Sequence, residues 1–234
     1  MIVLAIETAT REGSVALARD GRVLAEARGD ASQPHAARLP GDALALLDGH
    51  ALAVGDVDVF AVCLGPGGFT GLRVGIASAQ GLAFATGKPI VGISALDALG
   101  LAALEPSDDA AVAGVWMDAA RGEVFAARYR RDAHQLFGIR AVDEPVSARP
   151  LQVADAWAVD GSRVTLWIGE GAERYRECID ADSPIAPAPC LAPLVARMAT
   201  SAAGAGLAGA PHALRPIYVR PPDAVLAREK ASPA

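Results

Sequence analysis

The sequence is organised around Leu64-Gly65-Pro66-Gly67-Gly68-Phe69-Thr70-Gly71-Leu72-Arg73-Val74-Gly75-Ile76-Ala77-Ser78-Ala79-Gln80-Gly81-Leu82. Its first part is typical of a strand end and a tight turn, because glycine adopts positive φ at no steric cost. Its second part is typical of a helix. Two interpretations compete for the stretch: the turn holds a phosphate at the helix N-terminus, where the helix dipole favours an anion, or the helix presents a flat face to another helix.

Small residues form a stripe along this predicted helix. Gly71, Gly75 and Ala79 recur at four-residue spacing, with Leu72 and Ile76 beside them. A face without bulk lets a second backbone approach closely. We expect this face to meet a partner; packing against the chain's own sheet is the alternative. The helix is apolar nearly all round, so burial from two directions is expected.

The glycine turn matches neither common phosphate-binding fingerprint. No lysine follows its glycines, as a Walker loop requires. The dinucleotide fingerprint needs a glycine three positions after Gly67, and Thr70 stands there. The spacing therefore leaves the use of the turn open.

Composition excludes several protein classes. The chain has 234 residues, of which 52% are hydrophobic and 21% charged, as in a soluble globular protein. Its net charge of −6 makes it a poor candidate for the main binder of a nucleic acid. Cys63, Cys178 and Cys190 are too scattered for a disulfide framework. We find no signal peptide and no membrane span, and expect a cytoplasmic protein.

The first half reads as a strand meander followed by alternating helices and strands. Apolar or alternating runs predict strands at 2–6, 14–18 and 22–26, with Asp20-Gly21 as a hairpin turn. The helix that begins near His35 has one apolar face, made of Ala36, Leu39, Ala43, Leu46 and Leu47. Strands at 57–64 and 88–93 and a helix at 95–104, capped by Ser94, follow.

The second half repeats this opening after a polar break at 105–109. A strand at 111–116 leads into a turn at 117–122 and a strand at 123–129, so that Asp118 corresponds to Glu7. A second junction of strand, glycine and helix lies at 163–172. A proline-rich connection at 183–193, a last helix at 191–203 and an extended tail at 216–222 complete the chain.

Candidate chemistry is sparse. Glu7 and Asp118 end strands beside polar turns, where an acid can hold a metal–nucleotide complex or accept backbone amides. The four histidines never pair at three- or four-residue spacing, so no helix offers two imidazoles to a metal. His35 is expected to be a solvated residue at a helix N-terminus. No serine stands in a nucleophile elbow.

Four segments resemble one family over the whole chain: Leu4-Ala5-Ile6-Glu7-Thr8-Ala9-Thr10, the loop from Gly65 to Arg73, Met117-Asp118-Ala119-Ala120-Arg121-Gly122-Glu123-Val124, and Pro216-Ile217-Tyr218-Val219-Arg220. They resemble the TsaB (YeaZ) family of bacterial tRNA threonylcarbamoyladenosine biosynthesis proteins. The resemblance implies an α/β protein with two duplicated lobes of the actin/Hsp70/sugar-kinase-like (ribonuclease H-like) fold. We place these lobes at 1–106 and 107–234, with the last helix packing back on the first lobe.

The family resemblance also implies a role. TsaB is a non-catalytic subunit that pairs with its catalytic paralogue TsaD, and the ATPase subunit TsaE joins them. The paralogue carries two metal-binding histidines on its first helix, but Leu39 stands four residues after His35 here. We therefore expect no catalytic residue, metal or cofactor of its own, with ATP and metal on partner subunits and tRNA contacted through the complex.

Two sets of site residues follow from the resemblance. The pairing uses the first two helices, here with Leu39, Ala43, Leu46, Gly71, Leu72, Gly75, Ile76 and Ala79. A vestigial nucleotide site would comprise Glu7, Thr8, Gly67, Gly68, Thr70 and Asp118. Glu7 replaces the family's frequent aspartate and would crowd a nucleotide. When alone, the chain is expected to form a homodimer through the helix face. The alternatives are a free-standing ATPase or sugar-kinase-like enzyme, and a peptidase, which no constellation of a nucleophile with its partner residues supports.

Overall fold

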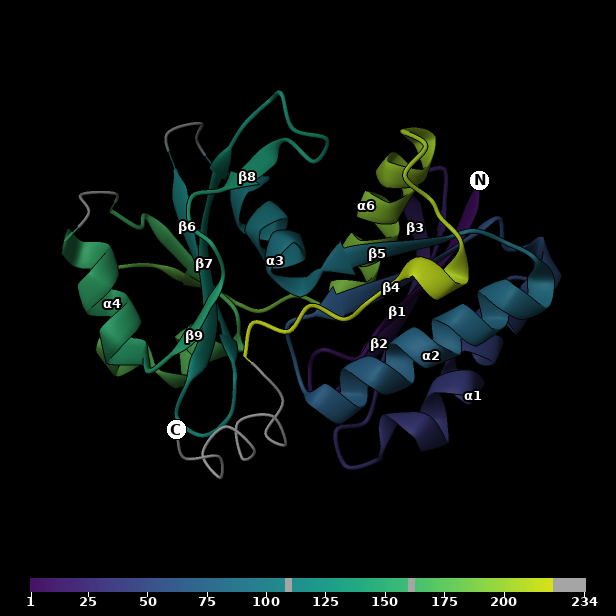
Figure 1. Ribbon diagram of the computed structural model, residues 1–234, viewed down its shortest axis with the longest axis horizontal. Helices are drawn as coiled ribbons and strands as arrows, with labels where there is room; N and C mark the ends of the chain where they lie inside the picture. The colour runs from purple at the N-terminus through teal and green to yellow at the C-terminus, as the bar shows by residue number, and fades with distance from the viewer. Residues whose placement is uncertain (108–110, 160–162, 221–234) are drawn as a thin grey trace, which may run out of the picture.

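The computed structural model describes residues 1–107, 111–159 and 163–220, which form two lobes side by side (Figure 1). The first lobe holds a five-stranded sheet in the order β3-β2-β1-β4-β5. Its strands are β1 (Ile2–Glu7), β2 (Ser14–Arg19), β3 (Arg22–Arg28), β4 (Val59–Gly65) and β5 (Ile90–Ser94). The first three strands are antiparallel neighbours, whereas β4 lies parallel to both β1 and β5.

The second lobe repeats this topology. Its sheet has the order β11-β10-β6-β7-β8, and β9 also pairs with β7. The strands are β6 (Val112–Asp118), β7 (Val124–Arg131), β8 (Ile139–Ala141), β9 (Val146–Ala148), β10 (Leu166–Ile168) and β11 (Ile185–Ala186). Again the first three strands in sequence form an antiparallel meander, and β10 lies parallel to β6 and β11. The predicted α/β class with two duplicated lobes is confirmed.

Helices lie on both faces of the first sheet. One face carries α1 (His35–Asp48), η1 (Val54–Asp56) and α2 (Phe69–Thr86), and the space between the two sheets holds α3 (Ala95–Leu104) and α6 (Leu191–Gly204) (Figure 1). Ser94 caps α3 as predicted, because its hydroxyl accepts the amide of Asp97 at 3.3 Å. The second lobe adds α4 (Pro150–Val159), α5 (Glu170–Arg174) and η2 (Arg176–Cys178), and η3 (Pro211–Ala213) follows α6.

The apolar run of β1 supplies both cores of the first lobe. Val3 and Ala5 pack in the cluster that includes α3, α6 and the second sheet, whereas Leu4 and Ile6 pack against α1 and α2. This alternation follows from the two-residue period of a strand. Since one apolar cluster joins α3 and α6 to both sheets, the two lobes share a core.

The C-terminal helix α6 lies against β1 and β2 of the first lobe. At its N-terminus the amide of Ala192 donates to the Ser14 hydroxyl at 3.2 Å. The boundary at residue 106 stays a prediction, because the polar break around it lies partly outside the described residues. The extended tail predicted for 216–222 is described as far as Arg220 and contains no regular element there.

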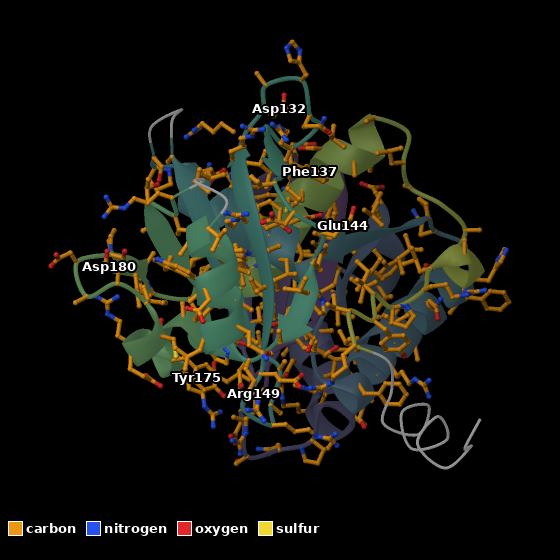
Figure 2. All side chains as sticks on the ribbon, turned by 60° about the vertical axis from the view of Figure 1, so that its left-hand side comes forward. Asp132, Phe137, Glu144, Arg149, Tyr175 and Asp180 are labelled. Atoms are coloured by element: carbon orange, nitrogen blue, oxygen red, sulfur yellow. The ribbon has the colours of Figure 1, made fainter. Side chains whose placement is uncertain are left out.

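Three elements, α4, β8 and β9, are not among those predicted from the sequence. The helix α4 buries only Pro150, Val153 and Trp157, and Leu151 and Val159 are exposed, so its apolar periodicity is weak. Figure 2 brings the second lobe forward, with Asp132 and Asp180 on loops at its margin. Phe137 lies on the same lobe and packs against the main core. Among the described residues, no helix combines the length and apolar character needed to cross a bilayer.

Candidate functional site

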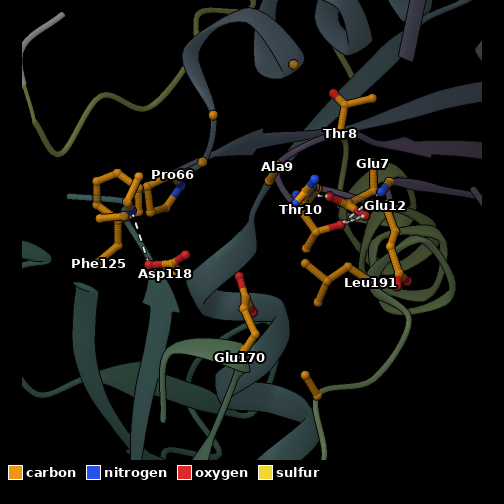
Figure 3. Close-up of a pocket in the computed structure, with 18 of the residues that line it drawn as sticks. Glu7, Thr8, Ala9, Thr10, Glu12, Pro66, Asp118, Phe125, Glu170 and Leu191 are labelled. Atoms are coloured by element: carbon orange, nitrogen blue, oxygen red, sulfur yellow. Dashed lines mark hydrogen bonds between the residues drawn. The ribbon is translucent and has the colours of Figure 1, made fainter. Parts of the chain in front are cut away.

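A cleft of about 970 Å³ opens between the two lobes at the carboxyl ends of β1 and β6 (Figure 3). Its lining comes from the turn after β1, the glycine loop before α2, the turn after β6, the start of α5 and residues 217–220. The matching strand ends bring Glu7 and Asp118 to the same cavity. Glu170 points into the same space (Figure 3).

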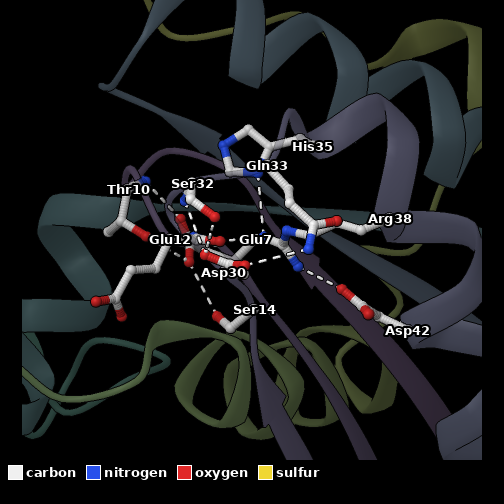
Figure 4. Close-up of polar contacts among 11 residues, drawn as sticks. Glu7, Thr10, Glu12, Ser14, Asp30, Ser32, Gln33, His35, Arg38 and Asp42 are labelled. Atoms are coloured by element: carbon white, nitrogen blue, oxygen red, sulfur yellow. Dashed lines mark hydrogen bonds and ion pairs between the residues drawn. The ribbon is translucent and has the colours of Figure 1, made fainter.

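The Glu7 carboxylate accepts hydrogen bonds from residues of the turn that follows β1 and from the start of β2 (Figure 4). The carboxylate accepts the Thr10 amide at 2.7 Å, the Thr10 hydroxyl at 3.0 Å and the Ser14 hydroxyl at 2.9 Å. Burial raises the pKa of Glu7, and these hydrogen bonds oppose the rise. The Ser14 hydroxyl also accepts from Ala192, so Glu7 organises the turn and, through Ser14, the start of α6. This is the geometry of an acid that accepts hydrogen bonds in a turn.

His35 is half-buried rather than solvated, which corrects the expectation for this residue. Its Nδ1 lies 3.2 Å from Nη2 of Arg38 (Figure 4). A guanidinium can only donate, so Nδ1 accepts and the imidazole is neutral. Burial and the charge of Arg38 both lower the pKa of His35. The buried Arg38 also binds Asp42 and the Glu12 carbonyl, which ties α1 to the turn after β1.

Two further acids face the cleft from the second lobe. The Asp118 carboxylate pairs with Arg174 at 2.7 Å and accepts the Ala120 amide at 3.2 Å. Glu170 begins α5 and is half-buried. Burial, and to a lesser extent the charges of Glu7 and Asp118, raises the pKa of Glu170 to about 7. The sequence predicts the junction of strand, glycine and helix at Gly169, but Glu170 is not among the predicted site residues.

Glu170→Gln should change how stability depends on pH. A carboxyl whose pKa rises from 4.5 to about 7 on folding stabilises the fold below its unfolded pKa, and this contribution is lost as the pH rises through 7. We expect the unfolding free energy of the wild type, relative to Glu170→Gln, to fall by about 1–2 kcal/mol between pH 4.5 and pH 8. Urea denaturation across this range measures the difference, and a constant difference would contradict it.

The glycine loop packs onto the turn after β1. A side chain at Gly67 would collide with the backbone of Ala9, and the Gly68 amide points to the Ala9 carbonyl at 3.4 Å. Thr70 is exposed at the start of α2. Thr8 is buried, and its Oγ1 has no hydrogen-bond partner among the described residues. The loop therefore positions α2 against β1, and its predicted role as a vestigial nucleotide site stays a prediction.

The small-residue stripe of α2 faces the chain's own sheet. A Cβ at Gly75 would overlap the Thr8 side chain, and one at Gly71 would lie 2.6 Å from the Thr8 carbonyl. The predicted partner residues that are buried inside the chain are Leu39, Ala43, Leu72, Gly75, Ile76 and Ala79. Gly71 and Leu46 are partly buried. The six buried residues cannot form a surface for a partner in this fold, which corrects their assignment to the partner surface. The assignment of Gly71 and Leu46 stays a prediction.

The opposite side of the two helices is exposed and poor in charge. We call it the α1/α2 outer face; its small and apolar members are Ala36, Ala37, Pro40, Gly41, Leu44, Ala45, Ala77, Gly81, Phe84 and Ala85. Phe84 is 83% exposed and Leu44 48%. Exposed apolar area of this kind, gathered on neighbouring helices, marks interaction sites in soluble proteins. The sequence predicts that α2 is apolar nearly all round, and this pattern does not distinguish the exposed side of the helix from the buried one.

Metal binding has no support in the described ranges. Across residues 1–107, 111–159 and 163–220, no group of three or more histidine, cysteine, aspartate or glutamate side chains is arranged to hold an ion. His35 has Leu39 one turn further along α1, and Leu39 is buried.

Relatives that match over nearly the full length decide the family. The tRNA threonylcarbamoyladenosine biosynthesis protein TsaB of Escherichia coli is 32% identical over 225 residues, which cover 94% of this chain and 95% of that protein. The chain belongs to the TsaB family. An uncharacterized protein of Mycobacterium tuberculosis is 35% identical and covers 95% of this chain and 93% of its own length.

Solved structures of the TsaB (YeaZ) family agree with this assignment. YeaZ from Pseudomonas aeruginosa has a TM-score of 0.76 at 28% identity, covering 93% of this chain and 99% of that one. A family model described as TsaD, tRNA N6-adenosine threonylcarbamoyltransferase, also matches residues 28–165. A threonylcarbamoyltransferase of Solidesulfovibrio magneticus is 39% identical, but over only 44% of this chain and 32% of that protein. The full-length likeness is thus to TsaB, and the likeness to the transferase is partial.

Proposed function

We propose that this TsaB-family chain is a non-catalytic subunit in tRNA threonylcarbamoyladenosine biosynthesis, and that it pairs with the catalytic paralogue TsaD. The observation that carries the proposal is the α1/α2 outer face. Phe84 and Leu44 stand exposed among alanines and glycines there, and exposing such a face is costly in an unpartnered protein. The partner surface thus remains on the two helices named from the sequence, but on their solvent side.

The polar groups of the cleft support a non-catalytic role. The Glu7 carboxylate is held by Thr10 and Ser14, and Asp118 is paired with Arg174. Neither carboxylate is free to hold a metal–nucleotide complex. We therefore assign ATP and metal to the partner subunits TsaD and TsaE. The net charge of −6 supports tRNA binding through the complex rather than by this chain alone.

A second candidate function is a free-standing ATPase or sugar-kinase-like enzyme that would use Glu7, Asp118 and the loop at Gly65, and the observation in its favour is the volume of the cleft, about 970 Å³. Calorimetric titration of the isolated chain with Mg-ATP separates the two functions. Tight binding that is lost in Glu7→Ala would favour the enzyme. Heat at the level of dilution is the result expected of a subunit without its own nucleotide site.

Reconstituted tRNA modification tests the proposal directly. With TsaD, TsaE, tRNA and the threonylcarbamoyl donor present, omitting this chain should reduce product to background, because the catalytic subunit lacks its activator. This chain with donor and tRNA alone should form no product. Undiminished modification without the chain, or modification by the chain alone, would contradict the proposal.

A further inference from the structure

The C-terminal segment runs back along α2 after α6 ends (Figure 1). Gly209 forms a bridge with Ile90 at the edge strand β5. The Gln80 side-chain amide, on α2, donates to the Pro211 carbonyl at 2.7 Å. These contacts place the segment along one side of α2, and it then continues to the mouth of the cleft.

At the cleft the segment binds the first turn of α2 and the end of β4. The Ile217 amide donates to the Leu64 carbonyl at 2.8 Å. The Tyr218 ring stacks on Phe69 with centroids 5.4 Å apart. The Arg73 guanidinium lies 3.9 Å from the centre of the Phe69 ring, and its Nε donates to the Tyr218 hydroxyl at 3.1 Å. Tyr218 is therefore held by stacking and by a hydrogen bond.

Two residues later the segment reaches the other lobe. Arg220 donates to the Glu123 carboxylate at 2.8 Å and to the Ala119 carbonyl at 3.0 Å. The hydrogen bond from Arg220 lowers the pKa of Glu123. Tyr218 and Arg220 thus attach one short segment to both lobes, and residues 217–220 form a wall of the cleft.

The turn that Arg220 binds is strained. Ala120, Arg121 and Gly122 have φ values of 57°, 56° and 75°, so two residues with side chains adopt the left-handed conformation in succession. Each such residue costs roughly 1–2 kcal/mol and persists only where the surroundings hold it. Arg220 contacts both ends of this turn, at Ala119 and Glu123. The surroundings that hold the turn therefore include the C-terminal segment.

We propose that residues 217–220 form a clasp across the mouth of the cleft. The clasp holds the first turn of α2 and the strained turn of the second lobe in one fixed relation. The first turn of α2 continues into the α1/α2 outer face, so docking of the catalytic partner there depends on a closed clasp. This last step rests on the proposed function; the clasp itself does not.

Hydrogen exchange of the Ile217 amide tests the clasp without any partner. Tyr218→Ala and Arg220→Ala should each speed its exchange by about tenfold or more, because each loses a contact that holds one end. The double variant should exchange no faster than about twice the faster single variant, since a clasp released at one end is already open. Unchanged protection in Arg220→Ala, or multiplied effects in the double variant, would overturn the proposal.

Two variants control for unfolding. Arg215 donates only to the His212 and Leu214 carbonyls among its described contacts, so Arg215→Ala should leave the exchange of Ile217 unchanged. Tyr218→Phe keeps the stacking on Phe69 and loses the hydrogen bond to Arg73. The Ile217 amide should therefore exchange faster than in the wild type, but by a smaller factor than in Tyr218→Ala. If Tyr218→Ala fails to fold, Tyr218→Phe and Arg220→Ala decide the question.

Binding to TsaD tests the dependence on the clasp. Measured by titration calorimetry, Arg220→Ala should bind TsaD at least about fivefold more weakly than Arg215→Ala. No binding by the wild-type chain would contradict the proposed function and leave the exchange result standing. If Arg220→Ala and Arg215→Ala bind TsaD equally well although the Ile217 amide exchanges faster in Arg220→Ala, the clasp exists but docking of TsaD does not depend on it.

Discussion

Gly75→Ala should lower the free energy of unfolding by about 2 kcal/mol, although alanine is the better helix former. The added methyl group would occupy the place of the Thr8 hydroxyl, which is buried at the end of β1. The helix cannot move away easily, since Leu72 and Ile76 on either side of Gly75 are themselves packed in the cores. Urea denaturation of the isolated chain measures the loss.

The same helix supplies a matched control. Gly81 is exposed, and a Cβ there would meet nothing within 4 Å. Gly81→Ala should therefore raise the unfolding free energy by up to about 1 kcal/mol, the difference in helix propensity. Thr8→Ala in the Gly75→Ala background should restore part of the loss, because it removes the overlapping atoms. Equal effects of the two glycine substitutions would show that Gly75 is not tightly packed.

The small-residue stripe of α2 shows what residue spacing predicts about helix packing and what it leaves open. Four-residue spacing of Gly71, Gly75 and Ala79 predicts a close approach, and α2 does approach Thr8 closely. Spacing carries no information on whether the approaching backbone belongs to the same chain. Both sides of α2 are apolar, so the amphipathic signal that normally separates inside from outside is weak in this helix.

Strand patterns were more informative because their signals are local. The continuous apolar run at 2–6 predicted a strand buried on both faces, and β1 contributes to both cores. Asp20 and Gly21 predicted the hairpin, and both adopt the positive φ that a two-residue hairpin turn needs. The correspondence of Glu7 and Asp118 likewise predicted two lobes with one topology.

The contacts at the cleft could not be predicted in this way. Arg73 and Tyr218 are 145 positions apart, and Arg220 and Glu123 are 97 apart. Neither pair leaves a pattern in its own segment. Glu170 follows a recognisable strand–glycine junction, but its raised pKa depends on burial and on Glu7 and Asp118, which only the fold brings near.

Ala77→Arg should weaken binding to TsaD by at least about a hundredfold while the chain stays folded. Ala77 is exposed in the middle of α2, and arginine is a good helix former, so the free energy of unfolding should change by less than about 0.5 kcal/mol. In a complex docked on the α1/α2 outer face, the guanidinium would be buried without a partner among apolar side chains, which costs several kcal/mol. Titration calorimetry with TsaD measures the loss.

Ala158→Arg makes the same substitution at an exposed helical position on the second lobe and should bind TsaD as the wild type does. Light scattering of the two variants in the absence of TsaD separates the homodimer from the heterodimer. If both assemblies use the α1/α2 outer face, Ala77→Arg is a monomer that also fails to bind TsaD, and Ala158→Arg retains both. A variant Ala77→Arg that binds TsaD normally would exclude this face as the docking surface. If both variants lose binding to TsaD, the loss cannot be attributed to the α1/α2 outer face, because Ala158 lies on the other lobe.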